Sequence, residues 1–354
     1  MNDEFQSVSG YAGRWVARVR GRIVAQGGTP EQALHAAQKS RHKEKPEIIY
    51  MPITFSHSPL IDKIRDVLPE KEIYLVGGAV RDMLLNRLSR DLDFALPSNG
   101  ISTARKVANA LKANFMVLDD ERDTGRVIFT DDDGARTFLD FATYRGENLE
   151  EDLHNRDFTV NAIAFDIQAQ SIFDPLNGAS DLRAKLIRTC SPSSISDDPV
   201  RILRAIRQAA EFECKIELET RKAMKQAANL LPNVSPERKR DELFKILEGP
   251  KPDAAMRALE MLGVFPHLLP ELTAMKGTAQ SKPHIYDVWE HTLSVLGHLD
   301  SIIAALRIGY SAEETKDMYT GLLTVRIGRF REQLAEHFTN SLNTDRSLRA
   351  AVFF

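Results

Sequence analysis

The stretch IYLVGGAVRDMLL, residues 73–85, decides the fold of the chain. Four apolar or aromatic residues run into two glycines, and a helical pattern follows, so the predicted order is strand, glycine turn, helix. Two glycines let the backbone approach a ligand closely, and the N-terminus of the following helix offers N–H groups and a positive dipole to a phosphate. Arg81 adds a cation in the first turn. Taken alone, the stretch is equally typical of a tight packing turn.

The next motif is DLDF, residues 91–94, which is predicted to be a strand. Alternation along a strand places the carboxylates of Asp91 and Asp93 on one face and the two apolar residues on the other. Close carboxylates repel each other unless a cation holds them together, and paired acids suit magnesium and two-metal phosphoryl transfer. Asp140 lies on a later apolar strand and is a candidate third acid. A solvated strand face for the pair and an edge-strand acid for Asp140 are the alternatives.

The regions around these motifs alternate between short apolar strands and helical stretches from residue 58 to about 181. This alternation is the signature of a mixed α/β domain. The predicted strands are 73–76, 91–95, 115–118, 126–130, 137–141 and 162–166. After residue 196 the strands stop, and helices are predicted at 199–210, 219–230, 236–247, 253–262 and 288–307. The sequence therefore predicts an α/β head followed by an all-α part.

A small α+β appendage is predicted at residues 1–52. Alternation at 14–19 and 22–26, on either side of a glycine-containing turn, predicts a hairpin. Thr29, Pro30 and Glu31 combine an N-cap, a first-turn proline and an early acid, so a helix is predicted to begin there. No acidic, His or Cys cluster stands out, so the appendage reveals no chemistry.

Composition excludes several classes of protein. The chain has 354 residues, 43% hydrophobic and 27% charged, which is typical of a multi-domain globular protein. A net charge of -3 excludes a uniformly basic nucleic-acid binder, but residues 183–257 hold sixteen Lys or Arg against eleven Asp or Glu, a local excess suited to an RNA partner. Two cysteines without a CxxC pair, and no apolar N-terminal signal, predict a reducing cytoplasm. No apolar run approaches the roughly 20 residues that a membrane span needs, so no membrane function is expected.

Ordered motifs along the chain resemble the class II tRNA nucleotidyltransferases and bacterial poly(A) polymerases. They are GGAVRD at 77–82, DLD at 91–93, RDFTVNA at 156–162, DPLNGASDL at 174–182, DDPVRILRAIR at 197–207 and ERKRDELFKIL at 237–247. The resemblance covers roughly residues 58 to 300. It implies a polymerase β-like nucleotidyltransferase head with a mixed sheet at 58–182, a neck with nucleotide-reading and RNA-binding helices at 183–248, and a helical body at 249–354.

For the head, the resemblance implies that Asp91 and Asp93 bind Mg²⁺ and that, with Asp140, they form the catalytic set. One departure is Asn155, which stands where the family usually has a second arginine before Arg156. Asp157 and Asn161 are expected to hold the backbone of their motif rather than touch substrate. The expected nucleotide contacts in the head are Gly77, Gly78, Arg81 and Arg156.

The helix after Asp198 carries the expected base-reading residues. Asp198 followed by Pro199 is an ordinary N-cap with proline at the first helical position. Arg201, Arg204 and Arg207 recur every three residues and form a slanted cationic stripe with no acid between them. The resemblance implies that Asp198 and Arg201 read the base edge of CTP or ATP, while Arg204 and Arg207 assist at the base and phosphates.

The implied reaction is template-independent transfer of CMP and AMP from CTP and ATP to the 3′ end of tRNA, with release of pyrophosphate. Within the family, a poly(A) polymerase and enzymes that add only CC or only A are alternatives. A non-catalytic RNA-binding relic is the alternative from another class. The enzyme readings name tRNA or another RNA, and the triphosphates, as partners, whereas the relic would bind RNA alone.

The segment at 283–293 resembles the opening of an HD phosphohydrolase domain. No histidine of the chain is followed by aspartate, as the metal site of such a domain requires, and the chain ends at 350–354 near where that part would begin. We therefore expect a shortened HD-like region, with no hydrolase site at His284, His291 or His298.

Overall fold

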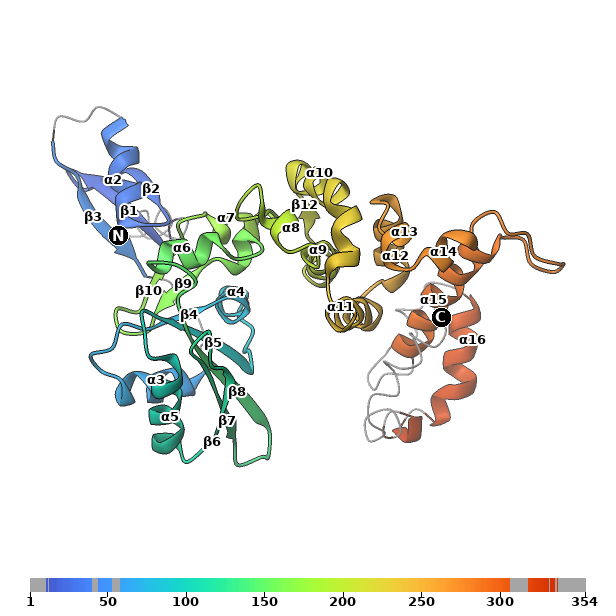
Figure 1. The fold of residues 1–354 in the computed structure, drawn as a ribbon, viewed down its shortest axis with the longest axis horizontal. Coiled ribbons are helices and arrows are strands. Elements are labelled where there is room, and N and C mark those ends of the chain that lie inside the picture. The colour runs from blue at the N-terminus through green and yellow to red at the C-terminus, as the bar shows by residue number, and fades with distance from the viewer. Residues whose placement is uncertain are drawn as a thin grey trace. The chain divides into compact units, whose positions relative to one another are not determined.

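The computed structural model describes Tyr11 and residues 13–39, 44–52, 58–305, 318–330, 332–334 and 336. It divides the chain into two compact units, the first ending at Ser194 and the second beginning at Ile195 (Figure 1). Each unit is described by itself below. The finer division at residues 52, 182 and 248 stays a prediction.

A seven-stranded mixed sheet is the frame of the first unit. Its order is β10 (Ser171–Phe173), β9 (Ala164–Asp166), β4 (Tyr74–Val76), β5 (Asp91–Leu96), β8 (Arg136–Thr143), β7 (Thr124–Thr130) and β6 (Asn114–Asp119). Strands β5 and β8 run parallel, and the other five pairs are antiparallel. The predicted α/β head with a mixed sheet is confirmed, with β10 as an additional edge strand.

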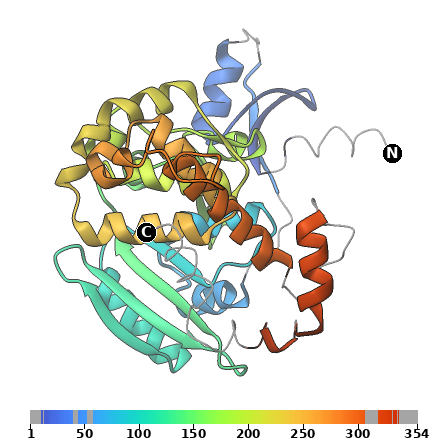
Figure 2. The same ribbon diagram turned by 90° about the vertical axis from the view of Figure 1, so that its right-hand side faces the viewer.

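Alternate positions of the central strands build the core on one face of the sheet. Leu92 and Phe94 of β5 and Leu139 and Phe141 of β8 are all buried, and the two phenylalanine rings stack with centroids 4.8 Å apart. Helix α5 (Gly100–Leu111) packs against β7 and β8, beside the sheet in Figure 2. The remaining positions of β5 and β8 carry the acids, which therefore point away from this core.

Shorter elements complete the head. They are α3 (Pro59–Val67), α4 (Gly78–Leu84), α6 (Leu149–His154), the 3₁₀ helix η2 (Thr159–Asn161), α7 (Gly178–Arg183) and β11 (Leu186–Ile187). Helix α4 follows β4 directly through Gly77, so the predicted strand, glycine turn and helix are present.

The N-terminal residues form a small sheet of their own within the first unit. Strand β1 (Arg14–Val19) lies between β2 (Arg22–Gly27) and β3 (Glu47–Met51), antiparallel to both. Helix α2 (Pro30–Lys39) packs on these strands. The predicted hairpin and the predicted helix start are confirmed.

The second unit is helical, as predicted, apart from the two-residue strand β12 (Lys215–Ile216). Its helices, with α8 at the unit boundary, are α8 (Ser194–Asp197), α9 (Arg201–Glu211), α10 (Leu218–Ala227), η3 (Ala228–Asn233), α11 (Pro236–Glu248), α12 (Pro252–Met261), α13 (Phe265–Leu268), α14 (Pro270–Ala274), α15 (Val288–Ala305), α16 (Met318–Ile327) and η5 (Gly328–Phe330). Within the described ranges, no helix combines the length and the apolar character needed to cross a membrane. The chain end on which the shortened HD-like region was predicted lies outside the described residues.

Candidate active site

The structure brings Asp91, Asp93 and Asp140 to the same side of the sheet. Asp91 and Asp93 are two positions apart on β5, and the parallel register sets Asp140 of β8 directly beside Asp93. The side chain of Asp93 is exposed toward a cavity, and protein atoms on its other sides replace part of the water around the carboxyl group. This desolvation raises the pKa of Asp93, and the charges of Asp140 and Asp91 add to the effect, while Arg156 and Arg126 oppose it.

Asp140 is held by Arg126, a partner that the sequence did not reveal. Arg126 stands opposite Asp140 in the antiparallel β7–β8 pair. Its Nε and Nη2 donate to the two carboxylate oxygens, each at 2.7 Å, which is the two-point geometry of a strong arginine–carboxylate pair. Asp140 is therefore engaged by an arginine, whereas Asp91 and Asp93 are the two acids on β5 left for a cation.

A cavity of about 720 Å³ opens beside Asp93 and Asp140. Its walls come from β5, the β6–β7 turn, the end of β8 and helix α6. Acids, arginines and hydroxyl groups dominate the lining, so a polar, charged ligand suits it. The lining residues are Val76, Asp93, Phe94, Ala95, Leu118, Asp119, Glu121, Arg122, Asp123, Thr124, Asp140, Ala142, Thr143, Tyr144, Arg145, Asp152 and Arg156.

Gly77 joins the glycine turn to this cavity. Its φ is +75°, a left-handed conformation that favours glycine. A Cβ on Gly77 would lie 3.2 Å from Nη1 of Arg156 and 3.4 Å from Oδ2 of Asp93, so a side chain here would crowd both groups. Arg156 is fixed by Asp152, which accepts hydrogen bonds from its Nη2 at 2.8 Å and its Nε at 3.1 Å. The predicted contacts of Gly77 and Arg156 to a nucleotide thus fall beside the acids.

Arg81 has a different setting. Its Nη1 donates to Asn161 at 2.7 Å, and its Nε and Nη2 donate to Asp82 at 3.0 and 2.9 Å. Asn161 in turn donates to Asp157, whose carboxylate also accepts the backbone N–H of Phe158. Asp157 and Asn161 therefore hold the backbone of their motif, as expected, and Arg81 is tied to that network rather than lining the cavity.

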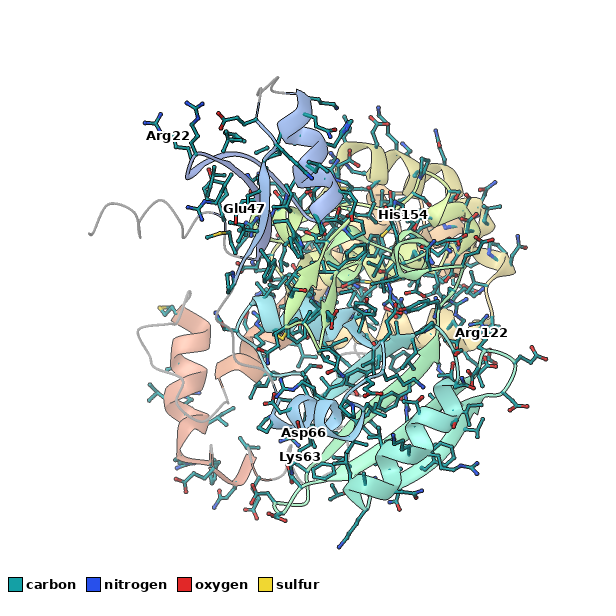
Figure 3. The ribbon with its side chains drawn as sticks, turned by 90° about the vertical axis from the view of Figure 1, so that its left-hand side faces the viewer. Arg22, Glu47, Lys63, Asp66, Arg122 and His154 are labelled. Carbon is teal, nitrogen blue, oxygen red and sulfur yellow. The ribbon has the colours of Figure 1, made fainter. Side chains whose placement is uncertain are left out.

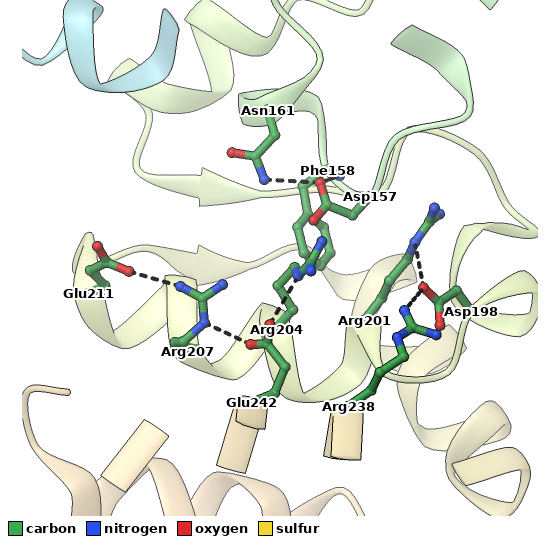
Figure 4. Close-up of polar contacts among 10 residues, drawn as sticks. All are labelled: Asp157, Phe158, Asn161, Asp198, Arg201, Arg204, Arg207, Glu211, Arg238 and Glu242. Atoms are coloured by element: carbon green, nitrogen blue, oxygen red, sulfur yellow. Dashed lines mark hydrogen bonds and ion pairs between the residues drawn. The ribbon is translucent and has the colours of Figure 1, made fainter. Parts of the chain in front are cut away.

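The arginines of α9 are paired with an acid from another helix (Figure 4). Nε of Arg207 donates to Glu242 of α11 at 2.8 Å, and Nε of Arg204 lies 3.4 Å from the other oxygen of the same carboxylate. Glu242 is only 5% exposed. Arg207 also pairs with Glu211 on its own helix. The stripe predicted from α9 alone is therefore partly neutralised within the second unit.

Asp198 does not cap α9, which begins at Arg201 after Val200. The prediction of an N-cap at Asp198 was wrong because the residues from Asp198 to Val200 form a separate turn before the helix. The Asp198 carboxylate instead accepts a hydrogen bond from Nη2 of Arg238 at 2.6 Å and lies 4.0 Å from Nε of Arg201 (Figure 4). A carboxylate and a guanidinium thus stand side by side, as the base-reading prediction requires.

The histidines of the predicted HD-like region make only local contacts among the described residues. The rings of His284 and His291 meet edge to face, with centroids 4.7 Å apart, and His298 contacts the backbone oxygen of Ser294.

Comparison with known proteins agrees with the motifs. Residues 73–188 match the family described as "Poly A polymerase head domain", residues 214–276 match "Probable RNA and SrmB- binding site of polymerase A", and residues 6–54 match a family of unknown function. The predicted resemblance to this group is confirmed, and enzymes with such heads use divalent metals.

Relatives of known name are similar to more than half of the chain. The chain is 34% identical over 250 residues to a CC-adding tRNA nucleotidyltransferase of Synechocystis, covering 70% of this chain and 55% of the relative. It is 38% identical over 230 residues to an A-adding tRNA nucleotidyltransferase of Deinococcus radiodurans, covering 64% and 51%. The chain spans about half the length of the curated relatives it matches.

A solved structure extends the likeness. It is a tRNA nucleotidyltransferase complexed with a primer tRNA and an incoming ATP analog, 26% identical, with a TM-score of 0.57 and 82% of each chain covered.

The head can accommodate a divalent cation. Asp91 and Asp93 offer hard oxygen ligands on one strand face, and their mutual repulsion falls when a cation lies between them. Within the described residues, no group of three or more His, Cys, Asp or Glu side chains is arranged to hold a metal, which agrees with Asp140 being bound by Arg126. The protein alone thus provides a pair of acids, and phosphate oxygens of a bound nucleotide would complete the ligand set.

Proposed function

We propose that this chain is a tRNA nucleotidyltransferase that transfers CMP and AMP from CTP and ATP to the 3′ end of tRNA. The observation that supports the proposal most directly is the paired Asp91 and Asp93 beside a polar cavity, in a poly A polymerase head. The named relatives are a CC-adding and an A-adding tRNA nucleotidyltransferase, which supports tRNA as the acceptor. The cytoplasm, where tRNA and both triphosphates are present, is the proposed location.

Each residue's role in the proposed reaction follows from its position. Asp91 and Asp93 bind the metal, for which we propose Mg²⁺ because both ligands are carboxylates. When bound, the cation activates the RNA 3′ hydroxyl and neutralises the triphosphate. Arg156, fixed by Asp152, contacts the phosphates from the side of Gly77. The catalytic part proposed for Asp140 is to adjust the charge around Asp93, with Arg126 holding its carboxylate.

Base choice is proposed to lie in the second unit. Asp198 supplies an acceptor and Arg201 a planar donor, and the two groups are 4.0 Å apart. Arg238 restrains the Asp198 carboxylate. The proposed help of Arg204 and Arg207 at the nucleotide is modest, because both are already paired with Glu242.

The decisive experiment is incorporation of labelled CTP and ATP, separately and together with Mg²⁺, onto tRNA that lacks its last three, two or one nucleotides. Addition that stops at CCA supports the main proposal. Addition of only CC or only A makes the chain a partial enzyme, and long A tails make it a poly(A) polymerase.

A substitution separates catalysis from RNA binding in the same assay. Asp91→Ala should reduce incorporation at least 1000-fold, because two-metal transfer depends on both β5 acids, while tRNA binding remains. Asp66→Ala, on the exposed surface of α3 (Figure 3), is the control and should keep full activity. If Asp91→Ala retains incorporation, the assignment of the metal ligands is wrong, and if the unaltered chain binds tRNA without incorporation, it is a non-catalytic RNA binder.

A further inference from the structure

The N-terminal module, of which residues 13–39 and 44–52 are described, contacts a short segment of the head, residues 172–177. The backbone oxygen of Gly28 accepts a hydrogen bond from the N–H of Asp174 at 3.0 Å. The approach is so close that a Cβ on Gly28 would lie 1.7 Å from the Asp174 oxygen. Glycine at this position lets the two backbones meet.

A buried ion pair crosses the same boundary. Arg14 is 7% exposed and Asp174 is fully buried. Nη1 of Arg14 lies 3.6 Å from the Asp174 carboxylate, and Nη2 donates to the side chain of Asn177 at 2.9 Å. A buried carboxylate needs compensating charges and hydrogen bonds. Arg14 of the module supplies one positive charge to Asp174, in addition to Arg183 and the N–H groups of Gly178 and Ala179 in the head.

Three polar side chains of the module add bonds to the head's backbone. Trp15 Nε1 donates to the Ile172 oxygen at 3.3 Å, and the Tyr50 hydroxyl accepts from the Ile172 N–H at 3.0 Å. Gln32 donates to the Pro175 oxygen at 2.6 Å. The N-terminal module therefore forms hydrogen bonds to the backbone of strand β10 and of the turn that follows it.

The gripped segment leads to the loop that carries site residues. The Asp174 carboxylate accepts the N–H groups of Gly178 and Ala179, which fixes the start of α7. Helix α7 packs on η2, where a Cβ on Gly178 would lie only 1.9 Å from the Thr159 oxygen, and Thr159 donates to Asp181 at 2.7 Å. Thr159 lies between Arg156 and Asn161 in the chain.

From these contacts we propose that the N-terminal module is an intramolecular buttress: by gripping residues 172–177 it fixes α7 and, through α7, the position of the 156–161 loop. The module then has a positioning role within the nucleotidyltransferase and is a working part of the head. The claim that the module fixes α7 and the 156–161 loop, which is the mechanical part of the inference, does not depend on the reaction proposed above. Only its consequence for incorporation rests on that reaction.

Hydrogen exchange of the full chain tests the mechanical part. Arg14→Met removes the buried charge and keeps the length of the side chain. Amides of residues 172–179 and 158–161 should then exchange about tenfold faster, since local opening needs less free energy when a buried pair is lost. Arg22→Met is the matched control, because Arg22 is exposed on β2 of the same module (Figure 3). In this variant, amide exchange at residues 172–179 and 158–161 should be unchanged.

A milder variant keeps the test decisive if Arg14→Met does not fold. Trp15→Phe removes the indole N–H that bonds Ile172 and retains an aromatic ring, so exchange should still rise around residue 172. Unchanged exchange at 172–179 in the folded variants would overturn the buttress. Faster exchange confined to 172–179, with 158–161 unaffected, would overturn the link to the site loop.

The effect on the reaction is measured as the dependence of the incorporation rate on triphosphate concentration. Displacement of the 156–161 loop should raise the KM for the triphosphate several-fold in Arg14→Met, with tRNA binding unchanged, because Arg156 lies in this loop. If the unaltered chain has no activity, the proposed function fails while the exchange results still stand. If exchange at 158–161 rises and KM does not change, the positioning role is overturned.

Discussion

Asp93 lies beside two other carboxylates on the face of β5 that is exposed toward the cavity. Desolvation, followed by the charges of Asp140 and Asp91, raises the pKa of Asp93. A carboxyl whose pKa is higher in the folded chain than in the unfolded chain binds more protons when folded, so its ionisation lowers stability as pH rises. Its favourable contribution is complete below the ordinary Asp value of 3.8 and is lost as pH rises through the raised folded pKa.

We therefore expect Asp93→Asn to stabilise the metal-free protein at pH 7 by less than about 1 kcal/mol, because solvent screens an exposed carboxylate, and to abolish incorporation. The gain should be smaller at pH 4, because the advantage of the neutral side chain is lost as pH falls toward the ordinary Asp value of 3.8. Thermal unfolding at both pH values measures this, with the exposed Asp66→Asn as control. A loss of stability at pH 7 would show that Asp93 has stabilising partners that outweigh its desolvation.

The sequence alone predicted that Asp91 and Asp93 share one face of a strand, but it did not predict which side chains lie next to them. Asp91 and Asp93 were predictable because strand alternation puts positions i and i+2 on one face. The register of β5 and β8 places Asp140 beside Asp93, and the register of β7 and β8 places Arg126 opposite Asp140. The local pattern of apolar and polar residues does not predict the register between strands that are far apart in the sequence. Asp152 was more accessible to sequence reasoning, since it precedes Arg156 by one helical turn.

At the scale of elements, the turn between β4 and α4 has a matched control in the turn between β7 and β8. Gly77 and Gly134 have φ values of +75° and +79°. Alanine at either position is strained by the positive φ. A Cβ on Gly134 meets nothing within 4 Å, whereas one on Gly77 meets Arg156 and Asp93.

Gly77→Ala and Gly134→Ala should therefore both lose stability, by at least about 1 kcal/mol, but differ in activity. Only Gly77→Ala should lower incorporation, by roughly 10- to 100-fold, because small displacements of positioning groups have large effects on rate. Unfolding and incorporation are measured on both variants. Equal activity in the two would show that the glycine turn serves the fold alone.

Helices α9 and α11 are joined by Glu242, which is buried between Arg204 and Arg207. Glu242→Gln leaves two guanidinium groups without their shared carboxylate and should destabilise the protein by about 1–3 kcal/mol. Glu219→Gln on α10 removes an exposed pair with Lys222 and should change stability by less than about 0.5 kcal/mol. Urea unfolding compares them, and equal effects would contradict a structural role for Glu242.

Most elements were predictable because their apolar periodicity is strong, and the errors have local causes. Strand β10 has three residues and β12 has two, too few to show alternation. The start of α9 was placed too early because Asp198 followed by Pro199 satisfies the rule for a helix start, whereas the carboxylate is used by Arg238. Glu242 was missed because a stripe read from one helix cannot include acids from another.

At the scale of the molecule, charge is distributed unevenly although the net charge is only -3. The basic excess falls in residues 183–257, and Arg221 and Lys225 are exposed on one face of α10 within it. Since binding to phosphates releases counterions, RNA affinity should fall steeply with salt.

Neutralising Arg221 and Lys225 to Gln should each reduce the slope of log affinity against log salt by about one unit. Binding of tRNA measured between 50 and 200 mM salt, a range in which such contacts change affinity strongly, tests this. Lys63→Gln on the exposed surface of α3 is the control. A slope unchanged in both α10 variants would place the RNA elsewhere on the molecule.

The pairing of β4 with β9 also has a consequence for how the head forms during synthesis. Val76 pairs with Asp93 of the nearby strand β5 but gains its second partner only after Ala164 has been synthesised, and Asp93 lies beside Asp140 only when β8 is complete. Contacts between residues far apart in the chain form slowly, because a long loop must close first. On the ribosome, Asp91 and Asp93 therefore emerge before Asp140, and the other side of β4 stays unpaired until residues 164–166 have left the exit tunnel.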